Sequence, residues 1–405
     1  MKKSIIALSI LTLFTACHKD NPDEEKVKAD RTVLVYIAGE NSLWDFIDDE
    51  LKEMRTGSKN IGDNNLLVYV DRTKTNEIPW LARVKNGQIT DSVSLADMKI
   101  SSTDEYASDP KVMEAVLRYA FNHYPSKNED YGLVLWGHAS GWLISNDSIT
   151  YTTMARKKAY GVDNGRNTNS DNGKWMNIPT MSKMLSKLPH LTFIFADCCN
   201  FMCLESAYEL RNVTDYLIGS PAEIPGVGAP YDTVVPAMFE RTTFWKSIVD
   251  RYYEQRAQGY DVPLSVIKTN EMTNLASATR TVLKTFVADF NGNYPDVSDI
   301  IHYYYDLSNR QEFFDANHFI LKYATTDNYQ VWKQALDKAV IYKKMAMTWM
   351  VNKTWNKYYA DFEMTEEHFG GVSMFIPQYQ LQYTDNDYIK QMGWYYAAGY
   401  SEIGW

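Results

Sequence analysis

The stretch LTFIFADCCNFMCLESAYEL, residues 191–210, decides the fold. Its first five residues are mostly apolar and rich in β-forming side chains, as a strand that is covered on both faces of a parallel sheet requires. Asp197, Cys198 and Cys199 follow this run, and apolar residues then recur at helical spacing. The stretch therefore predicts a strand that passes into a helix, which is where open α/β sheets commonly bind ligands.

A second stretch has the same design. YGLVLW, residues 131–136, predicts another buried strand, and Gly137 and His138 follow it. The separation of His138 from Cys199 suits a crossover between neighbouring parallel strands. A helix N-terminus favours the thiolate form of a cysteine, and a thiolate next to an imidazole can carry out nucleophilic catalysis. From these residues alone, a buried cysteine and a core histidine remain the alternative.

These motifs resemble those of the clostripain family of cysteine peptidases, which are relatives of caspases, gingipains and legumain. ESAYEL, residues 205–210, and WGHASGW, residues 136–142, are similar to the cysteine block and the histidine block of the family. The resemblance covers residues 31–231 well. It implies a caspase-like three-layer α/β sandwich, with a mostly parallel sheet, helices on both faces and a helical C-terminal part.

The resemblance also implies roles for individual residues. The spacing to ESAYEL makes Cys199 the nucleophile, and the histidine block makes His138 the proton shuttle. The backbone amides of Cys199 and Ala139 would form the oxyanion hole. Ala139 stands where the family has glycine, and a positive φ there would cost about 1 kcal/mol.

Substrate specificity is implied by two acids. Asp197 resembles the acid that family members place in the S1 pocket for Arg or Lys, and Glu223 in the loop SPAEIPG is the candidate second carboxylate. The alternative for Asp197 is an acid that stabilises a helix N-terminus. Family members are commonly matured by self-cleavage after a basic residue, and the candidates in the long polar segment after His138 are Arg156, Lys157 and Lys158. A solvated basic run is the alternative for these three residues.

Composition limits the other classes of function. The chain has 405 residues and a net charge of −10, which argues against nucleic acid as a partner. After Cys17, the cysteines at 198, 199 and 203 do not form a disulfide framework, and their CC-x3-C spacing lacks the usual zinc knuckle. We therefore expect no metal and no required cofactor, with a calcium requirement left open.

The N-terminus predicts the compartment. Residues 1–17 have a basic start, a short apolar run and a small-residue cleavage site ending in Cys17, as in a bacterial lipoprotein signal. An ordinary secretory signal is the alternative. We expect a flexible tether over residues 18–30, a caspase-like peptidase core over 31–235 and a helical region over 236–405 that completes the α/β domain. The expected location is the cell envelope, with a lipid anchor in a bacterial membrane.

The sequence thus predicts a secreted, lipid-anchored cysteine endopeptidase that cleaves proteins or peptides after Arg or Lys. The alternative, favoured by Ala139 and Ala222, is a catalytically weak or inactive relative that acts as a surface binding lipoprotein. Three local expectations accompany this prediction. They are a hairpin around Asn86 and Gly87, a helix over residues 329–351 and a late strand over residues 371–377.

Overall fold

The computed structural model describes residues 28–74, 77–101, 105–144, 159–163, 165, 173–255, 261–303, 313–349, 364–378 and 385–405. Three of the sequence predictions fall wholly outside these residues. They are the signal peptide, the lipidation site Cys17 and the self-cleavage candidates Arg156, Lys157 and Lys158.

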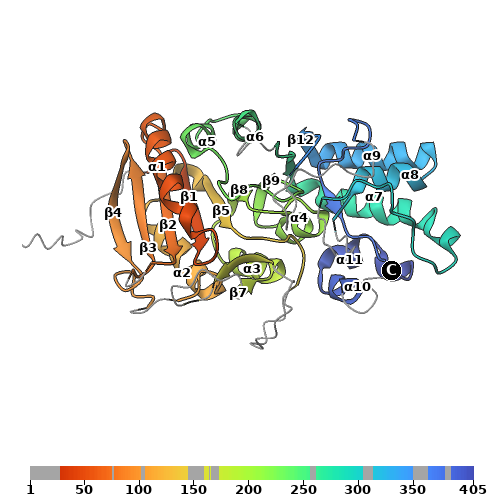
Figure 1. Cartoon of the computed structure of the whole chain (residues 1–405), viewed down its shortest axis with the longest axis horizontal. Helices are drawn as coiled ribbons and strands as arrows, with labels where there is room; N and C mark the ends of the chain where they lie inside the picture. Colours follow the sequence, from red (N-terminus) through yellow and green to blue (C-terminus); the bar gives the residue numbers. More distant parts are fainter. Residues whose placement is uncertain are drawn as a thin grey trace, which may run out of the picture.

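The described strands form one large sheet and two small ones. The large sheet contains β1 (Thr32–Gly39), β2 (Asn65–Arg72), β3 (Trp80–Lys85), β4 (Gln88–Ser94), β5 (Tyr131–Gly137), β8 (Leu191–Asp197), β9 (Thr214–Gly219), β10 (Leu264–Lys268) and β12 (Val340–Lys344). Their order is β12-β10-β9-β8-β5-β1-β2-β3-β4 (Figure 1). The two-stranded sheets pair β6 (Tyr160–Asp163) with β7 (Lys174–Met176), and β11 (Phe314–Asp315) with β13 (Ser373–Met374).

The direction of the strands divides the large sheet into a centre and two margins. The five central strands, from β9 to β2, are parallel. The pairs on both margins are antiparallel. Since the parallel strands all end at the same edge, the residues that follow β1, β5 and β8 meet there.

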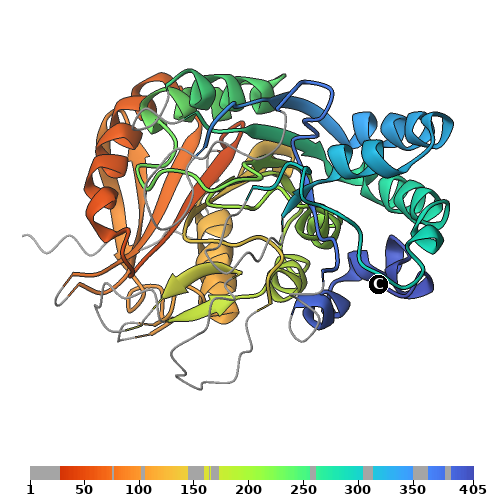
Figure 2. The ribbon, with the colours of Figure 1, turned by 45° about the vertical axis from the view of Figure 1, so that its right-hand side comes forward.

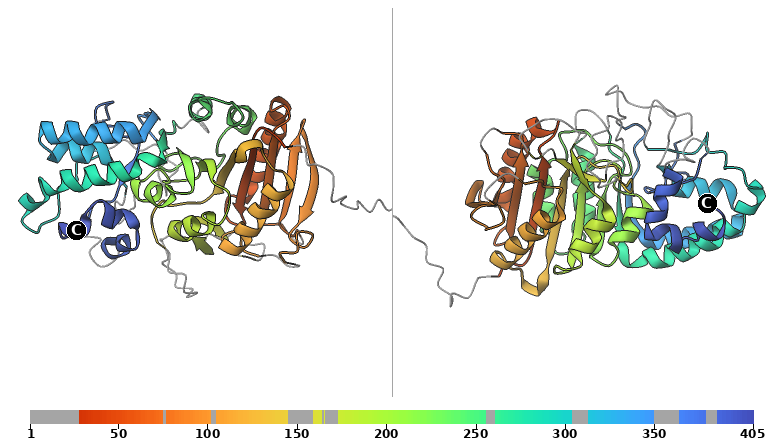
Figure 3. Two further views of the ribbon diagram at one scale, coloured as in Figure 1. Left: turned by 180° about the vertical axis from the view of Figure 1, so that it is seen from behind. Right: turned by 90° about the horizontal axis from the view of Figure 1, so that it is seen from below.

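Helices cover both faces of the sheet, as Figures 1 and 3 show. One face carries α1 (Ile47–Gly57), α5 (Tyr231–Met238) and α6 (Phe244–Glu254), and the other carries α2 (Pro110–His123), α3 (Ile178–Leu185) and α4 (Leu204–Leu210). The later helices gather beyond the β12 side of the sheet (Figure 2). They are α7 (Met272–Lys284), α8 (Ala316–Tyr323), α9 (Thr326–Ala339), α10 (Asp385–Tyr388) and α11 (Gly393–Ala397). The predicted three-layer sandwich is confirmed.

The two cores follow from the alternation of side chains along each strand. In β1, Leu34 and Tyr36 enter the core under α2, whereas Val33, Val35 and Ile37 enter the core under α1. Successive side chains of a strand point to opposite faces, so a fully apolar strand supplies both cores at once.

The predicted hairpin is confirmed as β3 and β4. Lys85 pairs with Gln88, so Asn86 and Gly87 form a two-residue turn. Both turn residues have positive φ, 49° and 83°, as the favoured hairpin turn requires.

The prediction of one helix over residues 329–351 is wrong. Helix α9 ends at Ala339, and the next five residues form β12, which pairs antiparallel with β10. The sequence VIYKK combines β-branched and aromatic side chains, and the open edge of β10 offers hydrogen-bond partners that no local pattern reveals. The late strand over 371–377 is also shorter than predicted, because only Ser373–Met374 pairs, and it pairs with β11 rather than with the large sheet.

Residues 29 and 30, at the end of the predicted tether, contact the folded domain. Ala29 is buried, and its carbonyl accepts a 2.7 Å hydrogen bond from the N–H of Lys127. Asp30 forms ion pairs with Lys127 and Arg241. None of the described helices is both long and apolar enough to cross a bilayer.

Candidate active site

His138 and Cys199 follow neighbouring strands at equivalent positions. Strands β5 and β8 are parallel partners, and their register pairs Trp136 with Asp197. His138 and Cys199 each lie two residues beyond this pair, at the carboxyl edge of the sheet. The structure therefore brings both predicted catalytic residues to the same edge on adjacent strands.

The three described cysteines differ in exposure. Cys199 is partly exposed, whereas Cys198 and Cys203 are buried. The alternation along β8 continues past its end, so Cys198 packs in the core under α2 and Cys199 lies against the core under α1. Burial is the main cause that raises the pKa of the Cys198 thiol well above its ordinary value, and burial also raises the pKa of Cys203. Both buried thiols are therefore poor nucleophiles at neutral pH.

The loop after β9 runs beside the cysteine. The N–H of Asn200 donates to the carbonyl of Ala222 at 2.9 Å, and the N–H of Met202 donates to the carbonyl of Ser220 at 3.0 Å. Farther along the loop, the N–H of Ile224 lies 3.4 Å from Cys199 Sγ. Backbone hydrogen bonds therefore fix residues 220–224 relative to the cysteine, and Ala222 has a structural role here.

His138 is held by the segment after β1 and by β6. Its Nε2 atom lies 2.9 Å from the hydroxyl oxygen of Ser42, in the segment after β1. Its carbonyl accepts a 2.8 Å hydrogen bond from the N–H of Gly161, and its ring lies 6.5 Å from the ring of Trp175. The side chain of Asn41 fixes the segment by donating to the carbonyls of Ala38 and Val162. Sequence reasoning missed Ser42, because a single serine after a strand is not a motif.

Ala139 does not adopt the positive φ that would be costly for a residue other than glycine. Positive φ falls on the flanking glycines, 142° at Gly137 and 55° at Gly141, and not on Ala139. Ala139 forms an antiparallel bridge with Tyr160 of β6. A methyl group at position 139 therefore carries no backbone penalty from a left-handed conformation.

Asp197 is buried under the loop that begins α5. Its Oδ2 atom accepts hydrogen bonds from the N–H of Ala229 at 3.0 Å and from the hydroxyl of Tyr231 at 2.9 Å. Only 2% of the residue is exposed. Burial raises the pKa of Asp197 from an ordinary 3.8 to about 6, and the two hydrogen bonds reduce this shift. Glu223, the second predicted S1 acid, is also buried.

One group of acids among the described residues has the geometry to hold a cation. Glu40, Asp71 and Asp163 place ligand oxygens within 4.8 Å of one another, and all three residues are buried. Asp163 also accepts hydrogen bonds from the N–H groups of Ala107 and Gly165. The oxygen donors suit a hard divalent cation, and they lie beside the carboxyl ends of β1 and β2.

Comparisons with known proteins agree with this geometry. The sequence profile of the clostripain family matches residues 35–405. A secreted C11 cysteine protease from Bacteroides thetaiotaomicron, solved with an irreversible peptide inhibitor, is 32% identical with a TM-score of 0.74, and the match covers 92% of this chain and 100% of that chain. An inactive zymogen C11 protease from Parabacteroides distasonis is 28% identical with a TM-score of 0.75, covering 92% and 98%. No curated protein matches the sequence.

The family profile and the solved proteases span the sheet and both helix layers. They also extend over the C-terminal helices, where the sequence resemblance was weak. The fold is therefore that of the caspase-like proteases, as the sequence predicted. The chain belongs to the clostripain family of cysteine proteases.

Proposed function

We propose that the protein is an endopeptidase that cleaves after Arg or Lys, with Cys199 as nucleophile and His138 as general base. One observation carries this proposal. Of the three described cysteines, Cys199 alone is partly exposed, and it lies in register with a histidine on the adjacent strand.

The proposed chemistry is acyl transfer in two steps. His138 Nδ1 takes the proton of the Cys199 thiol while its Nε2–H donates to Ser42, and the sulfur attacks the carbonyl carbon of the scissile bond. The backbone amides of Cys199 and Ala139 stabilise the oxyanion. The imidazolium then protonates the leaving amine, the C–N bond breaks and a thioester remains. Water, deprotonated by the same imidazole, releases the acid product and restores the thiol. None of these steps needs a cofactor.

The proposed basic specificity rests on acids next to the nucleophile. Asp197 precedes Cys199 by two residues, and its carboxylate holds the loop at Ala229 and Tyr231. A guanidinium or ammonium group near Asp197 would favour the ionised carboxylate, since an opposite charge offsets the cost of burial. The net charge of −10 is consistent with basic substrates.

Maturation and location complete the proposal. Self-cleavage at Arg156, Lys157 or Lys158 would leave the two halves joined by the sheet, because β5 and β8 lie on opposite sides of the cut and are hydrogen-bonded to each other. Lipidation at Cys17 would hold the enzyme in the cell envelope. The alternative of a silent binding lipoprotein loses part of its support, because Ala139 has no positive φ.

A panel of fluorogenic peptides with Arg, Lys, Asp or Ala before the scissile bond tests the proposal on the purified full-length protein. Cleavage of the Arg and Lys peptides, abolished in Cys199→Ala and retained in Cys198→Ala, is the expected result. The Cys199→Ala chain should also stay uncut on storage, while the wild type converts to two chains with a new N-terminus near residue 157. Activity that survives in Cys199→Ala would exclude the proposed nucleophile. Repeating the panel with a chelator decides whether a divalent cation is required.

A further inference from the structure

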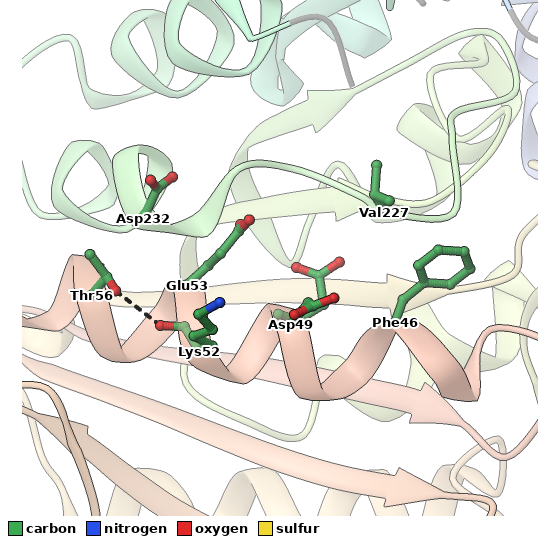
Figure 4. A pocket seen from close by; sticks show the side chains of 8 residues that line it. Phe46, Asp49, Lys52, Glu53, Thr56, Val227 and Asp232 are labelled. Carbon is green, nitrogen blue, oxygen red and sulfur yellow. Dashed lines mark hydrogen bonds between the residues drawn. The ribbon is translucent and has the colours of Figure 1, made fainter. Parts of the chain in front are cut away.

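A cavity of about 300 Å³ lies between α1 and the loop that leads into α5. Figure 4 shows Asp49 and Glu53 pointing from α1 toward the chain that carries Val227 and Asp232. The complete lining is Phe46, Asp49, Glu50, Lys52, Glu53, Thr56, Val227 and Asp232. Four carboxylates therefore face one ammonium group, and we call this space the acidic cavity.

Glu50 is a buried carboxylate with unused hydrogen-bonding capacity. It is 2% exposed, and its Oε1 atom accepts a 3.2 Å hydrogen bond from the indole N–H of Trp136. Its Oε2 atom has no hydrogen-bond partner among the described residues, and the same is true of Oδ1 of Asp232. A buried carboxylate oxygen without a donor is costly, and although Lys52 also lines the acidic cavity, it donates to neither of these two oxygens.

The electrostatics of the cavity agree with this geometry. Burial, followed by the nearby Asp197 and Glu53 carboxylates, raises the pKa of Glu50 well above its ordinary range. Burial is also the main cause of the raised pKa of Glu53. A cation in the cavity would offset both the burial and the repulsion between carboxylates.

The carboxylates suit an organic cation better than a metal ion. Among the described residues, the one group of acids compact enough for a metal is Glu40, Asp71 and Asp163, and no member of it lines the acidic cavity. Carboxylates that are spread around a larger space match a planar guanidinium or a long ammonium side chain, which donates several hydrogen bonds in different directions.

The acidic cavity is close to the nucleophile along one continuous loop. Ile224 donates to Cys199 Sγ at 3.4 Å, and Val227, in the cavity wall, comes three residues later. Three residues span at most about 10 Å. On the next residue, Gly228, a Cβ atom would lie 2.7 Å from the Asp197 carboxylate and 3.0 Å from the Glu50 carboxylate. The same loop therefore contacts the sulfur, Asp197 and the cavity.

We propose that the acidic cavity is a subsite for a basic side chain of the peptide substrate, with Glu50 and Asp232 as its specificity-determining carboxylates. The inference rests on the proposed peptidase function and adds residues of α1 and α5 to the recognition of the substrate. The short loop path places the bound side chain within a few residues of the scissile bond.

The test uses internally quenched peptides that differ in one side chain. Arginine is replaced by citrulline, which keeps the shape and removes the charge, at each position from four residues before to three residues after the scissile bond. In the wild type we expect a drop in kcat/KM of about tenfold or more at the position that enters the cavity. In Glu50→Gln, which retains an oxygen for the Trp136 hydrogen bond, arginine and citrulline peptides should be cleaved at similar rates at that position.

Two further variants make the result specific. Asp232→Asn should reduce the same preference, and it keeps the test available if Glu50→Gln does not fold. Glu209→Gln is the matched control, because this partly buried Glu of α4 bonds the N–H of Gly393, away from the cavity, and should leave the preference unchanged. Calorimetry with the uncleaved arginine and citrulline peptides on Cys199→Ala, with and without Glu50→Gln, measures binding apart from chemistry.

The possible failures are distinct. A wild type with no preference for arginine at any position contradicts the basic specificity in the proposed function. A clear preference that is unchanged in Glu50→Gln and in Asp232→Asn leaves that specificity intact and overturns the role of the acidic cavity.

Discussion

Compared with the wild type, Asp197→Asn should be more stable at neutral pH than at acid pH. The same substitution should impair catalysis. Burial raises the pKa of Asp197 from 3.8 to about 6. Below pH 3.8 the carboxyl is protonated in both the folded and the unfolded chain. Between the two values only the folded chain keeps the proton, so the wild type loses stability as pH rises.

The size of the effect follows from the shift. About two pKa units correspond to about 3 kcal/mol. Asn has no charge to bury, and its side-chain oxygen can still accept from Ala229. The free energy of unfolding of Asp197→Asn minus that of the wild type should therefore rise by up to about 3 kcal/mol between pH 4 and pH 7, and then stay level.

Urea denaturation at pH 4, 5, 6 and 7.5 measures this difference. The control is Asp91→Asn, which makes the same substitution at an exposed carboxylate, at a position with a φ of 53° that Asn tolerates. On Arg peptides, Asp197→Asn should lose about tenfold or more in kcat/KM. A stability difference for Asp197→Asn that does not change with pH would refute the argument, because it would mean that the buried carboxyl titrates normally.

Three further outcomes are expected. Iodoacetamide followed by peptide mapping should label Cys199 and spare Cys198, which is buried with a raised pKa; preferential labelling of Cys198 would contradict the assignment. Ser42→Ala should lower kcat about fivefold to tenfold with little change in KM, because it removes the hydroxyl that lies against the imidazole of His138, the proposed general base, and Ser42→Thr should restore kcat; equal kcat values for all three proteins would exclude a positioning role. In thermal unfolding, Gly62→Ala should lower the free energy of unfolding by about 1 kcal/mol, because Gly62 has a φ of 61° and open space around it. Gly228 has a similar φ of 60°, but a Cβ atom there would meet two carboxylates, so Gly228→Ala should lower the free energy of unfolding by about 1–3 kcal/mol more. Equal losses would mean that the loop at Gly228 moves aside freely.

Local sequence pattern was sufficient to predict the elements that flank Cys199, the proposed nucleophile. The apolar run before Asp197 and the helical spacing after it predicted β8 and α4, and both are present. The two-residue period of a strand also separates Cys198 from Cys199, and the structure places them on opposite faces. These features depend on neighbours in sequence, so the sequence reveals them.

The features that sequence reasoning missed depend on distant contacts. β12 is a strand because β10 lies beside it, and Ser42 matters because β5 brings His138 to it from 96 residues away. In the sequence, Glu50 is one of several acids on an amphipathic helix. The structure shows that it is buried, with the loop at Gly228 beside it. Charge and spacing alone do not show which of the acids on α1 is buried.

The direction of β1 determines on which side of the sheet a lipid anchor at Cys17 would be attached. β1 starts at Thr32 at the amino ends of the parallel strands, whereas His138 and Cys199 follow the carboxyl ends of β5 and β8. A strand of seven residues is about 23 Å long. A lipid at Cys17 would be attached through residues 18–27 to the amino ends of these strands, on the side of the sheet opposite the proposed catalytic edge. The attachment point of the anchor would therefore not obstruct a substrate that reaches the proposed catalytic edge.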